Sequence, residues 1–104
     1  MSWTWHPRAR DELTNAKRSP GGSVLVGELK ASTYSVSLGE GPTIPQVHPR
    51  IRLLPVATHE QWTLLYAEQH DGNYIALHLV NREWDKVPRP AFTLAMRRLE
   101  NNGH

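Results

Sequence analysis

The chain opens with a short strand pattern that leads into an amphipathic helix. Residues 3–5 alternate tryptophan and threonine, which are typical of strands. Pro7 fits the first turn of a helix, where its missing N–H costs nothing. Apolar residues then recur at helical spacing, at Ala9, Leu13 and Ala16. The pattern predicts a helix over residues 7–18, which ends at the Ser-Pro-Gly-Gly-Ser run of residues 19–23.

The middle of the chain has strand-like patterns on either side of a loop. Residues 24–29 and 34–38 are rich in β-branched and alternating residues, and we predict two short strands that could form a hairpin. Residues 39–49 hold three prolines and two glycines, which is typical of a surface loop. Residues 50–56 resume a strand pattern. Pro55 cannot donate to a ladder, so this strand is expected at an edge or at a bulge.

The strongest local signal is a second hairpin. Two alternating apolar runs, residues 61–67 and 74–80, flank Asp71-Gly72. Asp-Gly tolerates the positive φ angles of a tight hairpin turn. The sequence therefore predicts two antiparallel strands here.

The last element is a second amphipathic helix, in which apolar residues recur at helical spacing at Phe92, Ala95, Met96 and Leu99. Arg97 and Arg98 in its last turn complement the helix macrodipole. Taken together, the elements predict an α+β fold, with a small antiparallel twisted sheet packed by an N-terminal and a C-terminal helix. With 104 residues, we expect a single domain over residues 1–104.

Composition excludes several classes of protein. There is no cysteine, which excludes a disulfide scaffold and thiolate metal sites. We expect neither a secretory signal nor a membrane partner, since no apolar run approaches the ~20 residues of a membrane span. The net charge is only +2, but nine of the twelve basic residues are arginine, which suits contacts to phosphate and RNA bases. An ordinary solvated surface would account for the same composition.

Both ends of the chain carry a family pattern. At the N-terminus, a short strand leads into a Pro-x-Ala-x-x-x-Leu helix start at residues 7–13. At the C-terminus, ungapped matches run through Asp71-Gly72, Ile75, Leu77-His78, Arg82, Lys86, Pro88, Phe92, Ala95 and Arg97-Arg98-Leu99. On these residues the chain resembles the RelE/ParE/HigB superfamily of small bacterial toxins, and most closely its phage-derived HigB-like branch. Relatives carry a second helix packed against the first.

The resemblance implies a cytoplasmic type II toxin that cuts messenger RNA on the ribosome and is neutralised by a cognate helix-turn-helix antitoxin. Such cleavage needs a base for the ribose 2′-OH, cations for the pentavalent phosphate and a proton for the leaving oxygen. It requires neither a metal nor another cofactor. The sequence spacing of His6, His48, His59 and His70 does not match any metal-binding motif.

Four residues are candidates for catalysis. Arg50 and Arg52 have the i, i+2 spacing that places side chains on one side of a strand, and we expect them to contact phosphate. His78 matches the family's histidine and could act in acid–base catalysis, or be a packed structural residue. Tyr66 could position a nucleotide or end a core strand. The candidates for RNA binding are Arg82, Trp84, Lys86, Arg97 and Arg98, with base stacking on Trp84.

Two other functions remain open. The protein could be a catalytically degenerate member of the fold that binds a host protein, or a small phage or mobile-element inhibitor. Thr63 favours the first of these, because relatives commonly carry an arginine at that place in the strand. Steep salt dependence of nucleic-acid binding would separate the ribonuclease from both.

Overall fold

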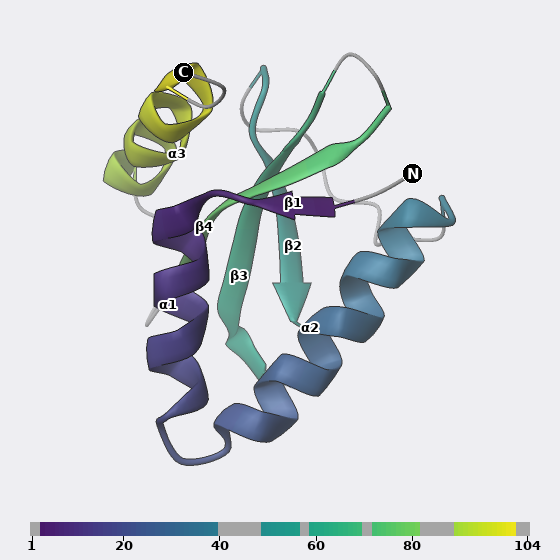
Figure 1. Cartoon of the computed structure of the whole chain (residues 1–104), viewed down its shortest axis with the longest axis vertical. Helices are drawn as coiled ribbons and strands as arrows, with labels where there is room; N and C mark the ends of the chain where they lie inside the picture. Colours follow the sequence, from purple (N-terminus) through teal and green to yellow (C-terminus); the bar gives the residue numbers. More distant parts are fainter. Residues whose placement is uncertain (1–2, 40–48, 57–58, 70–71, 82–88, 102–104) are drawn as a thin grey trace.

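A computed structural model describes residues 3–39, 49–56, 59–69, 72–81 and 89–101, apart from the side chains of residues 59–61 and 81. The helices and strands follow one another as β1 (Trp3–Trp5), α1 (Pro7–Lys17), α2 (Gly22–Ser37), β2 (Arg52–Val56), β3 (His59–Glu68), β4 (Tyr74–Asn81) and α3 (Arg89–Asn101) (Figure 1). This arrangement confirms the predicted α+β class, in which helices pack on a small sheet.

The sheet has the strand order β1-β4-β3-β2. Strands β2, β3 and β4 form an antiparallel meander, as expected. β1 differs, because it pairs with β4 in the parallel direction, with Trp3 opposite Tyr74 and Trp5 opposite Ala76. The sheet is therefore mixed. The pattern of residues 3–5 specified a strand but carried no information on its partner, which lies about seventy positions along the chain.

The predicted β3–β4 hairpin is confirmed. Ladder pairs run from Trp62 opposite Asn81 to Glu68 opposite Tyr74. The N–H of Gly72 donates to the carbonyl of Gln69 at 3.0 Å, and Gly72 has a φ of +85°, which a glycine adopts without strain. A register shift beside Leu65 adds a bulge within the ladder.

Strand β2 also matches its sequence. It is an edge strand, and its register against β3 shifts between Pro55 and Val56. Both features are those expected of a strand containing proline, which has no N–H for a ladder bond. The strand begins at Arg52, and Arg50 lies in the bend before it.

The prediction for residues 24–38 was wrong, because helix α2 replaces the two expected strands. Its buried residues recur at helical spacing, at Gly22, Leu25, Leu29 and Val36. The many β-branched and serine residues have weak helix propensity, which burial of this apolar face overrides. The helix ends where the sequence predicted a loop, at Gly39, whose φ is +78°.

The turn between α1 and α2 depends on two glycines (Figure 1). Gly21 precedes α2 with a φ of +78°. Gly22 packs directly on the end of α1, and a Cβ there would lie only 2.3 Å from the carbonyl oxygen of Lys17 and 2.5 Å from that of Ala16. The two helices can approach each other this closely only because Gly22 has no side chain.

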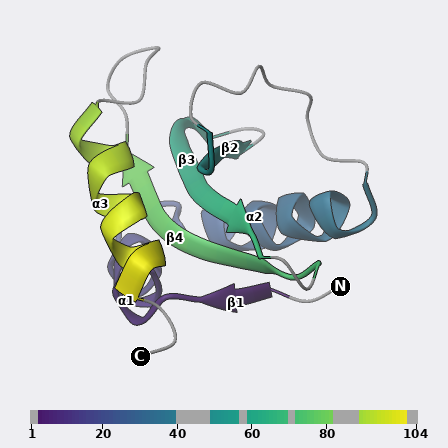
Figure 2. The same cartoon turned by 90° about the horizontal axis from the view of Figure 1, so that it is seen from above.

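Two apolar cores lie on the two faces of the sheet. One joins α1 and α2 to the sheet, and its largest members are Leu25, Leu29, Leu54, Leu64, Tyr66 and Tyr74. The other lies under α3 and contains Ile51, Leu65, Ile75, Leu77, Val80, Ala91 and Ala95. Successive residues of β2 and β3 point to opposite faces of the sheet, so neighbours along each strand belong to different cores. Figure 2 shows α3 and α2 in their separate positions around the strands.

Trp3 and Trp5 share one side of β1 and pack against the first core. The Trp3 ring stacks on Tyr74 with centroids 5.1 Å apart and lies 5.2 Å from Tyr66. Its indole N–H donates to the carbonyl oxygen of Thr33 in α2 at 2.9 Å. A three-residue strand is thereby fixed to both the sheet and a helix.

Several expectations fall outside the described residues: most of the proline-rich loop, Asp71, Arg82, Trp84 and Lys86. Within the described part of the chain, no helix is both long and apolar enough to cross a membrane.

Candidate functional site

Arg50 and Arg52 line one hollow at the end of the sheet. The hollow has a volume of about 500 Å³ and is lined by Pro49, Arg50, Arg52, Glu68, Gln69, Gly72 and Leu99. These residues come from the start of β2, the β3–β4 turn and the last turn of α3. The i, i+2 spacing predicted that both arginines lie on one strand, but Arg50 lies in the bend before β2. Both arginines nevertheless border the same space.

Arg52 is held by two groups on β3. Its Nη2 lies 3.2 Å from a carboxylate oxygen of Glu68, and both side chains are well exposed. Arg52 also hydrogen-bonds the hydroxyl of Tyr66, which stands directly opposite it in the ladder. Burial raises the pKa of Tyr66 above its usual value, although the positive charge of Arg52 opposes the shift. Tyr66 is consequently a protonated phenol at neutral pH.

This arrangement suits a phosphodiester. Guanidinium groups bind phosphate oxygens through paired N–H donors and remain charged at any physiological pH. Within the described lining of the hollow, Glu68 is the only carboxylate, and its ion pair with Arg52 is exposed, so a phosphate can replace Glu68 on the guanidinium. Tyr66 stands opposite Arg52 in the ladder and hydrogen-bonds its side chain.

A second polar cluster forms around Glu12 of α1. One carboxylate oxygen lies 3.0 Å from Arg98 Nη1 and the other 3.2 Å from Nη2, so the pairing is bidentate. His78 Nδ1 lies 2.8 Å from the same carboxylate, and the Leu79 N–H donates to it at 3.1 Å. Arg98 also donates to the Leu77 carbonyl at 2.8 Å.

The cluster lies at the edge of β4 and contains both a hydrogen-bond acceptor and a donor for the backbone of that strand. β1 covers the edge of β4 only as far as Ala76, whose carbonyl accepts from the His6 N–H at 2.9 Å. Beyond that point the edge of β4 has backbone groups without a strand partner. Glu12 accepts from Leu79 N–H and Arg98 donates to Leu77 C=O, so side chains from two helices continue the ladder.

The contacts of Glu12 determine its ionisation. Burial favours the neutral acid, but hydrogen bonds from His78, Arg98 and the Leu79 N–H outweigh burial and lower the pKa of Glu12 to about 2. The carboxylate is therefore ionised throughout the physiological range. A carboxylate with this many hydrogen-bond donors is a poor proton acceptor. Glu12 has a structural role instead, because its contacts join α1, β4 and α3.

His6 borders this cluster and begins α1. Its Nδ1 accepts the Arg8 N–H at 3.1 Å, which caps the helix. Burial lowers the pKa of His6, and the nearby charges of Arg98 and Arg8 lower it further. Both effects keep the imidazole neutral, as an accepting Nδ1 requires.

The structure separates the predicted catalytic residues into two places. Arg50 and Arg52 meet at the hollow with Tyr66 behind them. His78 is absent from the described lining of the hollow and instead pairs with Glu12. This contact matches the structural alternative considered for that histidine, and its acid–base role stays a prediction.

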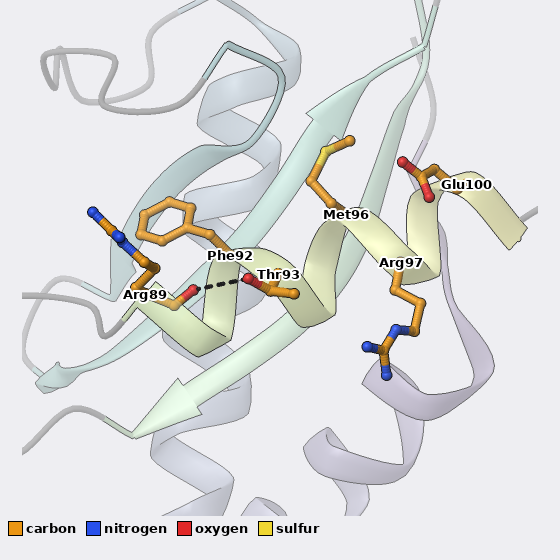
Figure 3. Close-up of a pocket in the computed structure, with 6 residues that line it drawn as sticks. All are labelled: Arg89, Phe92, Thr93, Met96, Arg97 and Glu100. Atoms are coloured by element: carbon orange, nitrogen blue, oxygen red, sulfur yellow. Dashed lines mark hydrogen bonds between the residues drawn. The ribbon is translucent and has the colours of Figure 1, made fainter.

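The adjacent arginines of α3 also differ. Arg98 is turned inward to Glu12 and is only 12% exposed, whereas Arg97 is exposed on the helix surface. Arg97 lines a shallow pocket of about 490 Å³ with Arg89, Phe92, Thr93, Met96 and Glu100. Figure 3 shows Arg97 pointing away from Phe92 and Met96. Of the pair, only Arg97 is presented for an RNA contact.

Sequence reasoning missed Glu12 and Glu68. Each occupies an ordinary polar position of its element, and its partners become visible only when the strands are in register. Arg52 stands opposite Tyr66 in the ladder, and Glu68 lies two residues after Tyr66 on the same side of β3. The Arg52–Glu68 pair therefore depends on the β2–β3 register, which the sequence did not give. Among the described residues, no three histidine, cysteine or acidic side chains gather in the manner of a metal site.

Comparison with known proteins adds no identity: no protein-family model matches the chain, and neither does any curated protein.

Proposed function

We propose that the protein is the toxin of a type II toxin–antitoxin system and acts in the cytoplasm as a ribosome-dependent messenger RNA endoribonuclease. Its active centre is the hollow bordered by Arg50 and Arg52. A cognate helix-turn-helix antitoxin would neutralise it. The ribosome would deliver the messenger to this hollow, so that the toxin needs to supply only a few reacting groups.

The convergence of two arginines carries the proposal. Arg50 and Arg52 come from the chain just before and at the start of β2, and both border a hollow of about 500 Å³. Two guanidinium groups at one place suit a phosphate that gains negative charge as it becomes pentavalent.

The reaction can be assigned to the groups at the hollow. Glu68 takes the proton of the ribose 2′-OH, whose oxygen attacks the adjacent phosphorus. Arg50 and Arg52 stabilise the pentavalent phosphate, and the bond to the 5′-oxygen breaks to leave a cyclic phosphate. The leaving oxygen takes a proton from water, and the hydroxide that remains takes the proton held by Glu68, which regenerates the carboxylate. Tyr66 is a positioning residue, because it holds Arg52 rather than facing the hollow itself.

The architecture gives independent support. Members of the family resembled by this chain carry a second helix packed against the first. The local pattern of residues 24–38 favoured strands, yet α2 is a helix and packs on α1 through Gly22. A second helix packed on the first is what the resemblance implies, and this arrangement supports the proposal.

The test is to induce the gene alone in a bacterial host, follow growth and map messenger RNA 5′ ends during translation. We expect growth arrest with in-frame cuts, both lost in the Arg50→Ala/Arg52→Ala double variant. Arg10→Ala is the matched control, because Arg10 is an exposed arginine of α1 distant in sequence from the hollow. Glu68→Gln should reduce cleavage while leaving ribosome binding intact.

Intact messages during growth arrest would overturn the ribonuclease proposal. They would favour the alternative function, in which the fold binds a host protein and has no chemistry. Thr63 is consistent with that alternative, because it stands where relatives carry an arginine and is buried. The double variant would then still arrest growth, and its protein partner could be isolated by affinity capture.

A further inference from the structure

Helix α2 has apolar residues on two opposite faces. The inner face consists of Gly22, Leu25, Leu29 and Val36, all buried against the sheet and α1. The outer face repeats the same spacing, at Val24, Gly27, Ala31, Tyr34 and Leu38, and all five are exposed. A helix with apolar residues on both faces is normally covered on both.

The outer residues form a continuous stripe. They follow one another at intervals of three, four, three and four, which is the spacing of a helix–helix seam. Val24 is 54% exposed, Tyr34 65% and Leu38 54%, and these are the large hydrophobic residues left exposed in the described part of the chain. Figure 1 shows α2 at the border of the molecule, where a partner could reach it.

The stripe is complementary to itself when a second copy runs antiparallel. With Ala31 at the crossing point, Val24 of one copy faces Leu38 of the other, and Gly27 faces Tyr34. A Cβ at Gly27 would meet nothing within 4 Å, so the glycine leaves an open hole opposite the largest side chain. Small residues at the centre allow close approach of the two backbones, and large residues close both ends.

We propose that α2 is the dimerisation helix of this protein, with a second copy of the chain bound antiparallel through Val24, Gly27, Ala31, Tyr34 and Leu38. The pairing of large with small positions satisfies the rule of a two-fold interface, in which residue i meets j and j meets i. One helix pair is a small contact, so we expect a reversible dimer with a Kd of roughly micromolar or weaker. The proposal does not depend on the ribonuclease function.

Cysteine cross-linking tests both the surface and its direction, since the natural chain has no cysteine. Ala31→Cys should form a disulfide-linked dimer under mild oxidation, and Asn15→Cys on the exposed face of α1 should not. Val24→Cys and Leu38→Cys should each form no disulfide cross-link alone but should cross-link when the two variants are mixed. Cross-linking of Val24→Cys with itself would indicate a parallel pair and overturn the proposed geometry.

Sedimentation equilibrium of the full chain provides the second test. We expect concentration-dependent dimerisation that is lost in Gly27→Glu, which fills the hole without touching the monomer's core. Asn15→Glu makes the same charge change on α1 and should leave the dimer unchanged. Two Lys30 side chains would flank the crossing on one side, so added salt should tighten the dimer rather than dissolve it.

Two results would overturn the proposal. One is a natural chain that stays monomeric up to millimolar concentration, in which case the stripe serves a different protein, such as a helix of the antitoxin. The other is a dimer that persists in both Gly27→Glu and Tyr34→Glu, which would place the interface elsewhere. Circular dichroism of each variant verifies that the fold is retained, as expected for exposed positions.

Discussion

At the scale of single residues, Glu12 is the centre of the polar cluster that joins α1, β4 and α3. It pairs with Arg98 and His78 and accepts the Leu79 N–H, although only 26% of its side chain is exposed. Glu12→Gln keeps the shape but removes the charge that offsets the partly buried Arg98. We expect it to cost about 2–3 kcal/mol in urea denaturation. Asp11→Asn, at the exposed neighbouring position, should stay within about 0.5 kcal/mol of the natural protein.

The same carboxylate predicts acid sensitivity. The folded pKa of Glu12 is about 2, below its ordinary value of 4.5, so the unfolded chain binds this proton first as the pH falls. The associated stability is fully present above about pH 4.5 and is lost as the pH falls towards 2. It amounts to at most about 3 kcal/mol at ~1.4 kcal/mol per pKa unit. Unfolding free energies measured across this range should fall less steeply in Glu12→Gln, and parallel curves would contradict the assignment.

Thr63 differs from Glu12, because its buried hydroxyl has no hydrogen-bond partner among the described residues. The residue is 1% exposed, and its Oγ1 finds no hydrogen-bond partner among the described residues. Thr63→Val replaces the hydroxyl with a methyl of similar size, and we expect stability to stay equal or rise by about 1 kcal/mol. Thr63→Ser keeps the hydroxyl but deletes the methyl and should lose about 1 kcal/mol. Thermal unfolding of the pair decides, and a less stable valine variant would reveal a hidden partner.

At the scale of elements, two glycines of α2 should respond to the same substitution in opposite ways. A Cβ at Gly22 would lie 2.3 Å from the backbone oxygen of Lys17, so Gly22→Ala should push α1 and α2 apart and cost about 1–3 kcal/mol. Gly27 has open space around it, so Gly27→Ala should gain about 1 kcal/mol from helix propensity alone. Urea denaturation at concentrations below dimerisation measures both, and a cost at Gly27 would contradict an exposed helix interior.

The elements differ in how far the sequence could specify them. The β3–β4 hairpin, α1 and α3 were predictable because periodicity, turn residues and propensity agreed there. In α2 these signals disagreed. Valine, threonine and tyrosine favour strands locally, while Leu25, Leu29 and Val36 have the helical spacing of a buried helix face. The strand prediction failed because it weighed local preference above the period of the buried face. The parallel partner of β1 is a non-local choice that no local pattern encodes.

At the scale of the whole molecule, the candidate site could be predicted only in part. The spacing of Arg50 and Arg52 brought them to one hollow because they are neighbours along the chain. Glu68 and Glu12 act on partners in other elements, and Glu12 lies 86 positions from Arg98. Such pairs depend on sheet register and helix placement, which arise from both cores together. Residue type alone does not distinguish these carboxylates from solvated ones.

The adjacent arginines of α3 show how the assembled molecule assigns different roles to the same side chain. Arg98 joins α3 to Glu12 of α1 and to the β4 carbonyl of Leu77, while Arg97 remains on the surface. Arg98→Ala removes the bidentate cation from the partly buried carboxylate of Glu12 and the donor from the Leu77 carbonyl, so we expect a loss of about 2–4 kcal/mol. Arg97→Ala should leave stability within about 0.5 kcal/mol of the natural protein.

The two substitutions should affect RNA binding in the reverse order, with the larger loss of affinity in Arg97→Ala. If Arg97 contacts ribosomal or messenger RNA, Arg97→Ala weakens association at low salt and lowers the slope of log affinity against log salt by about 1. Arg98→Ala, measured where the variant is still folded, should leave that slope unchanged because its guanidinium already serves Glu12. Filter binding over a salt series, paired with urea denaturation, resolves the two effects. Equal slopes in both variants and the natural protein would remove α3 from the RNA-binding surface.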